Sequence, residues 1–121
     1  YRIYHDPKKD KMIFIPSGMD QMFNEPRMGL YQNYNGMVAR AVMESDEGKK
    51  RFHNRMREIL KDVFKPDVIG KRLDALEKEL TAALMPIDAG TSRDYKNRIR
   101  DLKSRIETRA KHVEAELKKV K

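Results

Sequence analysis

The sequence contains no cysteine, few aromatic residues (7%) and no apolar run of about 18 residues. Without cysteine the chain has neither disulfides nor thiolate metal sites, although this absence fits a reducing compartment and a disulfide-free exported protein equally well. A mean hydropathy of -0.85 with 38% charged residues excludes a membrane-spanning helix. A length of 121 residues predicts one domain, which is long enough to bury a single core.

The common catalytic patterns are missing as well. The sequence has no nucleophile with a base, no histidine cluster that could hold a metal, and no glycine loop that could cradle a phosphate. Its three histidines, His5, His53 and His112, lie far apart, and we interpret them as strand or helix-boundary residues and not as ligands. The eight methionines occur mostly singly, which is typical of core and loop positions and not of a copper site.

The net charge of +8 lies mostly after residue 43, where basic and acidic residues are mixed. Opposite charges four residues apart are typical of solvated helix faces. Stacking aromatics do not alternate with the basic residues, so we do not expect a nucleic-acid partner. A non-catalytic basic helical module that binds a partner stays open as an alternative.

One carboxylate stands out within residues 12–23. A short apolar strand ends at Pro16, a bend follows at Gly18, and Asp20 comes next among apolar residues. A carboxylate in apolar surroundings needs a cation, a set of backbone donors or a metal. Asp20 is therefore the one candidate for chemistry that the residues themselves offer.

The chain before this carboxylate predicts a β-hairpin. Residues 1–6 and 11–15 are rich in β-forming residues and flank a polar turn. Because an isolated two-stranded hairpin is marginal in water, it must either lie on the helices or pair with strands upstream of Tyr1. We favour the upstream strands.

The chain after the carboxylate predicts a loop over residues 24–36, which are rich in Pro, Gly and Asn. Tyr31 and Tyr34 of this loop either form a wall of a site at Asp20 or are simply exposed.

Apolar residues spaced three and four apart predict helices over 37–44, 46–64, 66–84 and 93–120. Thr91 or Ser92 is the expected N-cap of the last helix. This helix carries the longest apolar seam, whose members are Tyr95, Ile99, Leu102, Ile106, Ala110, Val113, Leu117 and Val120. The seam fits a self-associating coiled coil or an antiparallel bundle, and short loops before it favour the bundle.

The sequence thus predicts an α+β, mainly α fold, with an N-terminal β-hairpin packed on a bundle of about four helices. The residues of the hairpin and of the following bend resemble the spore coat protein H (CotH) kinases, a family of atypical protein kinases. The family pattern is a strand pair followed by Phe-x-Pro-Trp-Asp-x-Asp-x-x-Phe. Residues 14–23 follow it, except that Ser17 and Gly18 replace Trp-Asp. Because the later helices also fit, the resemblance covers nearly the whole chain.

The resemblance implies that Asp20 binds the divalent ion, Mg²⁺, that bridges the phosphates of ATP, and that Phe23 anchors the turn. A second nearby carboxylate is missing, because Gly18 takes its place. The resemblance also implies that the catalytic aspartate and the nucleotide-binding residues of the family precede Tyr1. No catalytic or nucleotide-binding residue is therefore named within this chain.

These implications divide the chain into two parts. Residues 1–36 would be the hairpin and metal-site loop at the end of a kinase core, and residues 37–121 a C-terminal helical subdomain. The intact protein would transfer phosphate from ATP to serine-type hydroxyls of a protein substrate, with the upstream part of the same kinase domain as partner. We expect this segment alone to be inactive. A degenerate kinase scaffold, in which Gly18 marks lost activity, is the second alternative.

Overall fold

The computed structural model describes residues 2–31 and 36–120 of the chain. Its elements, in chain order, are β1 (Arg2–Asp6), β2 (Lys11–Ile15), the 3-10 turn η1 (Met19–Gln21), α1 (Met37–Glu44), α2 (Asp46–Glu58), the π-helical turn η2 (Ile59–Val63), α3 (Pro66–Leu84) and α4 (Ala89–Lys119). The α+β, mainly α class is confirmed. The predictions for Tyr1 and Tyr34 lie outside the described residues.

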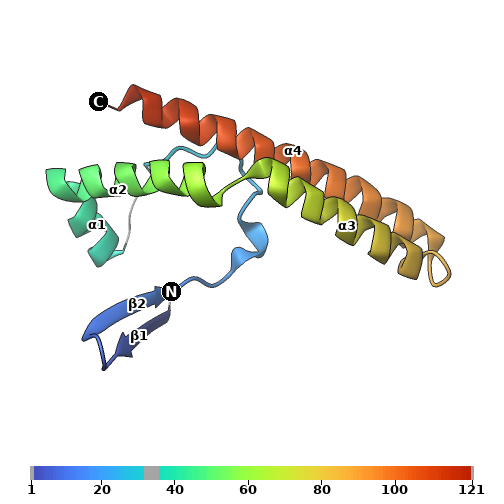
Figure 1. The fold of residues 1–121 in the computed structure, drawn as a ribbon, viewed down its shortest axis with the longest axis horizontal. Helices are drawn as coiled ribbons and strands as arrows, with labels where there is room; N and C mark the ends of the chain where they lie inside the picture. Colours follow the sequence, from blue (N-terminus) through green and yellow to red (C-terminus); the bar gives the residue numbers. More distant parts are fainter. Residues whose placement is uncertain (1, 32–35, 121) are drawn as a thin grey trace.

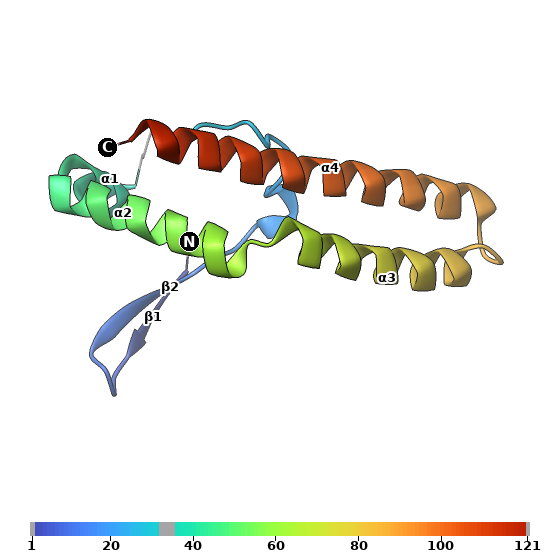
Figure 2. The same ribbon diagram turned by 45° about the horizontal axis from the view of Figure 1, so that its top comes forward.

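Helices α3 and α4 form a long antiparallel pair (Figures 1 and 2). The predicted seam of α4 faces inward along this helix, because Ile99, Ile106 and Val113 are all buried. A tight turn joins the pair, and next to it the hydroxyl of the fully buried Ser92 of α4 donates to the carbonyl of Thr81 of α3 at 3.2 Å. The seam therefore serves an intramolecular antiparallel packing, as the short loops predicted.

Helix α2 lies against the second half of α4 (Figure 1). The apolar cluster between them contains the buried side chains of Leu30, Val113 and Leu117. Three half-buried side chains of α2 and η2 pack against this cluster: Phe52, Met56 and Leu60. The predicted helix over residues 46–64 is confirmed in extent, but its last turn widens into the π-helical turn η2.

Helix α4 begins at Ala89, four residues earlier than predicted. Its N-cap is Asp88, so the expectation of Thr91 or Ser92 was wrong. One carboxylate oxygen of Asp88 accepts the backbone N–H of Gly90 at 2.8 Å and that of Thr91 at 3.1 Å, while the other accepts the Thr91 hydroxyl at 2.7 Å. These bonds satisfy N–H groups that the first helical turn leaves without a partner.

The hairpin extends away from the helices in both views (Figures 1 and 2). Its two antiparallel strands pair from Arg2 opposite Ile15 to Asp6 opposite Lys11. The expected packing of the hairpin on the helical bundle therefore differs from the observed arrangement. Apolar side chains on both faces are exposed; they are Ile3, Tyr4, Met12, Ile13, Phe14 and Ile15. An isolated hairpin with two apolar faces cannot bury either one by itself.

Helix α1 packs beside the first turns of α2 and leaves much of its apolar surface open (Figure 1). Its Met37, Val38 and Val42 are all exposed. None of the helices in the described part of the chain is both long and apolar enough to cross a membrane.

Candidate functional site

The candidate carboxylate lies on a single 3-10 turn that directly follows the hairpin. Gly18 has a φ of 69°, in the left-handed region that glycine adopts without steric cost. The chain then closes η1, where the N–H of Met22 donates to the carbonyl of Met19 at 3.2 Å. Asp20 occupies the middle of this turn and its side chain is exposed. The bend predicted from Pro16 and Gly18 is therefore present.

An aromatic contact ties this turn to the helices. The ring of Phe23 stacks on that of Phe64, with centroids 6.0 Å apart and an interplanar angle of 18°. Phe64 directly follows the π-helical turn η2. The resemblance implied an anchoring role for Phe23, and the structure shows that Phe23 contacts the helical part of the chain three residues after Asp20.

The residues after Phe23 run alongside α4 as a connecting segment (residues 24–31; Figure 2). Arg105 donates from Nη1 to the side-chain oxygen of Asn24 at 3.3 Å, and Arg109 donates from Nη1 to the carbonyl of Met28. Leu30 then enters the apolar cluster of α4. Three successive turns of α4 thus contact successive parts of the connecting segment.

Arg105 also interacts with a carboxylate on its own helix. Arg105 forms an ion pair with Asp101, which lies one turn earlier. The hydrogen bond from Arg105 lowers the pKa of Asp101, and the same bond raises the pKa of Arg105. Burial, in contrast, lowers the pKa of Arg109, because desolvation disfavours its charged form. Arg109 is thus the more enclosed of the two arginines.

Tyr31 lies at the far end of the connecting segment and contacts a buried histidine. The Tyr31 hydroxyl and Nε2 of His53 form a hydrogen bond, and the ring of Tyr31 also lies 6.5 Å from that of Phe52. His53 is only 6% exposed, which makes it a core residue of α2 and not the boundary residue that we expected. These contacts place Tyr31 against α2 and not beside Asp20, so they give no support to Tyr31 as a wall of a site at Asp20.

The stability of this contact should depend on pH. Burial, followed by the positive charge of Arg57, lowers the pKa of His53 below its ordinary value of 6.5. Between the two pKa values the unfolded chain binds more protons, so stability is present above about pH 6.5 and is lost as the pH falls below it. We expect the melting temperature to drop from pH 7.5 to 5.5, as measured by circular dichroism.

Two variants test whether His53 causes the pH dependence of the melting temperature. His53→Gln should reduce the pH dependence of the melting temperature, and His5→Gln is the control, since His5 lies in the exposed hairpin and not in α2. An equal slope in wild type and His53→Gln would contradict the assignment.

The remaining candidate histidines play no part near Asp20. His5 Nε2 lies 2.8 Å from a carboxylate oxygen of Asp10, so it serves the hairpin turn. His112 is half-buried on α4, where its Nε2 has no hydrogen-bond partner among the described residues. Both follow the interpretation of histidines as structural residues.

The donor set near Asp20 is small. In residues 2–31 and 36–120, no group of three or more histidine, aspartate or glutamate side chains could hold a metal ion. A single carboxylate is nevertheless compatible with Mg²⁺, because this ion is commonly held by one or two carboxylates together with waters and substrate phosphates. The residue type present therefore fits a shared metal site in which the nucleotide supplies further oxygens.

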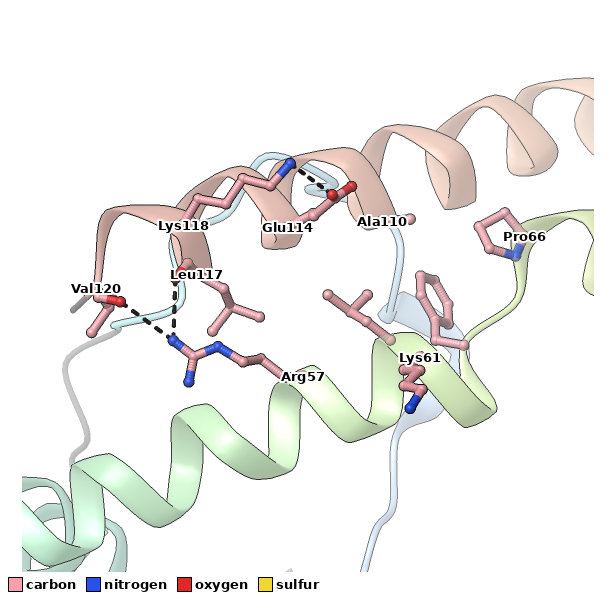
Figure 3. A pocket seen from close by; sticks show the side chains of 10 residues that line it. Arg57, Lys61, Pro66, Ala110, Glu114, Leu117, Lys118 and Val120 are labelled. Carbon is pink, nitrogen blue, oxygen red and sulfur yellow. Dashed lines mark hydrogen bonds and ion pairs between the residues drawn. The ribbon is translucent and has the colours of Figure 1, made fainter.

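A groove of about 700 Å³ lies between η2 and the second half of α4 (Figure 3). Its walls include the apolar side chains of Leu60, Phe64 and Leu117. Two cations at its rim already have partners: Arg57 Nη2 donates to the carbonyls of Leu117 at 3.4 Å and Val120 at 3.3 Å, and Lys118 pairs with Glu114 at 2.8 Å (Figure 3). Lys61 is a third cation in its lining, and six of the ten lining residues are apolar, so the groove is mainly apolar.

The structure thus combines an antiparallel strand pair, a turn that carries Asp20, and four helices. The model of the family described as "CotH kinase protein" matches residues 1–115, nearly the whole chain, and the chain belongs to this family. Comparison with curated proteins and with solved structures gives no match. Family membership supports a kinase-like function at the level of the family.

Proposed function

We propose that this chain is the C-terminal part of a CotH-like atypical protein kinase, which transfers phosphate from ATP to serine-type hydroxyls of a protein substrate. In this proposal Asp20 is a ligand of the Mg²⁺ ion that accompanies ATP. The family match over residues 1–115 is the observation that carries the proposal. Asp20 is exposed on η1, so water can satisfy its carboxylate in this chain, and its role as a metal ligand rests on the family match and not on its surroundings.

The chemistry of phosphate transfer explains why one carboxylate matters. The transfer needs little covalent help from the protein and depends on positioning and on neutralisation of charge at the phosphates. Mg²⁺ supplies that neutralisation when bound, and a carboxylate is the hard oxygen ligand that it prefers. Asp20 would hold the ion, while the glycine bend and the stacked Phe23 hold Asp20.

The hairpin supports a further part of the proposal, that the kinase core includes chain upstream of Tyr1. The sheet in the described part of the chain has only the strands β1 and β2, and apolar side chains are exposed on both of its faces. A strand pair with apolar side chains on both faces needs a covering layer on each side, which the described residues do not supply. The upstream part of the domain would supply these neighbours, the catalytic aspartate and the nucleotide-binding residues.

The test compares two proteins in the same assay. A protein that includes the upstream part and the 121-residue chain are each incubated with labelled ATP and candidate protein substrates, with Mg²⁺ or with a chelator. We expect label on serine only with the longer protein and only with Mg²⁺. Absence of metal-dependent ATP binding by the longer protein would contradict the proposal and favour the degenerate scaffold, in which Gly18 marks the loss of the second carboxylate.

A further inference from the structure

The turn that carries Asp20 is short and lies next to an exposed hairpin, so its position depends on the residues that come after it in the chain. We propose that Arg105 and Arg109 of α4 (the arginine pair) are positioning residues, which fix the Asp20 turn through the connecting segment and thereby set the affinity of the site for Mg²⁺. This inference rests on the proposed function, because it concerns the same metal site. It assigns the arginine pair no contact with substrate or metal.

A chain of hydrogen bonds joins Arg105 to the turn. Arg105 Nη1 donates to Oδ1 of Asn24 at 3.3 Å, and the backbone N–H of Asn24 donates to the carbonyl of Gln21 at 3.1 Å. Gln21 is the last residue of η1 and directly follows Asp20. The position of Arg105 is itself fixed by its ion pair with Asp101. Two hydrogen bonds therefore separate a guanidinium on α4 from the residue next to the proposed metal ligand.

Arg109 holds the next part of the same segment. Its guanidinium donates to the carbonyl of Met28, and the N–H of Met28 donates in turn to the carbonyl of Glu25 at 3.0 Å. Arg109 is half-buried, and desolvation disfavours its charge. A partly buried cation is tolerated where it has a hydrogen-bond acceptor, and here the backbone of the segment supplies that acceptor.

The spacing of these contacts shows that the two arginines bind the same connecting segment side by side. Arg105 and Arg109 are four residues apart and thus lie on one face of α4, and their acceptors Asn24 and Met28 are also four residues apart. The connecting segment therefore follows α4 in the same direction along the chain. Phe23, which directly precedes this segment, stacks on Phe64, which follows η2. The residues after Asp20 therefore contact two parts of the helical chain that are distant in sequence.

Precise placement matters for a metal ligand more than for an ordinary surface carboxylate. A misplacement of about 1 Å at a reacting centre can cost roughly 100-fold in rate. Residues that orient metal ligands commonly change metal affinity by about 10- to 100-fold when they are replaced. Because Asp20 is exposed on one short turn, its placement relative to the rest of the kinase depends on contacts such as those of the arginine pair.

The experiment measures the Mg²⁺ concentration at half-maximal activity in the longer protein. Arg109→Gln and Arg105→Gln should raise this concentration by about tenfold, and saturating Mg²⁺ should restore most of kcat. Arg98→Gln is the matched control, since Arg98 lies on the same helix and pairs with Asp94 at 2.8 Å one turn away. This control should leave the Mg²⁺ requirement unchanged. Arg109→Lys should recover part of the affinity, because lysine can still donate to the Met28 carbonyl.

A second measurement uses the 121-residue chain and needs no activity. Amide hydrogen exchange at Asn24, whose N–H donates to Gln21, should become faster in Arg109→Gln and Arg105→Gln but not in Arg98→Gln. Unchanged exchange at Asn24 in both variants would overturn the inference.

The activity assay separates this inference from the proposal on which it rests. If Asp20→Ala abolishes activity while the arginine variants keep the wild-type Mg²⁺ requirement, the positioning role is wrong and the metal-ligand role stands. If Asp20→Ala retains full activity, the metal-ligand role itself is wrong.

Discussion

If the longer protein transfers phosphate as proposed, replacing Asp20 by asparagine is expected to lower its kcat by roughly 100-fold or more. A bound metal ion supplies several kcal/mol of stabilisation to the developing charge at the phosphates, and each 1.4 kcal/mol corresponds to about tenfold in rate. Asparagine keeps the shape of the side chain but removes the negative charge that attracts Mg²⁺. The effect should therefore appear in Mg²⁺-dependent phosphate transfer and not in the unfolding curve.

Asp10→Asn provides the matched control for this prediction. Asp10 lies in the hairpin turn close to the same strands, its side chain is 95% exposed, and asparagine tolerates its positive φ of 49°. We expect wild-type activity from this variant. Undiminished phosphate transfer by Asp20→Asn, measured beside Asp10→Asn, would remove Asp20 from the mechanism.

The helical half of the fold could be predicted because its signals are local. Every helix was placed from apolar spacing, and the buried apolar residues of α4 belong to the predicted seam. The start of α4 was misplaced because Gly90 disfavours a helix, whereas the three bonds accepted by Asp88 outweigh that cost. Asp88, two residues before Gly90, is a typical N-cap residue and indicates the true start of α4.

The candidate site was predictable only in part. The bend at Gly18 follows from the sequence, since glycine adopts a left-handed conformation freely. The contacts that hold the bend could not be predicted, because Arg105 and Arg109 each lie 81 residues from their partners. The spacing of Asp101 and Arg105 predicts their ion pair, which is confirmed, but no local pattern indicates that Arg105 and Arg109 contact residues 24–28. The metal-ligand role of Asp20 stays a prediction.

The position of the hairpin depends on its surroundings. Its strands and turn follow from alternation and turn residues, and they are confirmed. The expected packing on the helices did not occur, because the apolar surfaces of α3 and α4 are largely directed at each other, and the cluster of α2 and α4 takes Leu30 instead. The faces of the sheet therefore stay open in the described part of the chain.

Replacing Leu117 by alanine should destabilise the chain by about 2–5 kcal/mol, the usual cost of removing a buried leucine side chain. Leu117 is 5% exposed and packs in the cluster that joins α2, α4 and the connecting segment. Leu80→Ala is the matched control on α3, because Leu80 is 42% exposed and should cost about 1 kcal/mol or less. Urea unfolding followed by helical circular dichroism measures both changes.

Leu117→Ala also tests whether the apolar cluster supports the segment that follows Asp20. Since Leu30 shares the cluster with Leu117, the cavity left by alanine should loosen the end of the connecting segment as well as α2. Amide exchange should therefore rise around residues 28–31 in Leu117→Ala and stay unchanged in Leu80→Ala. Equal destabilisation by the two variants, without faster exchange in the segment, would contradict the packing of α2 and of the connecting segment on α4.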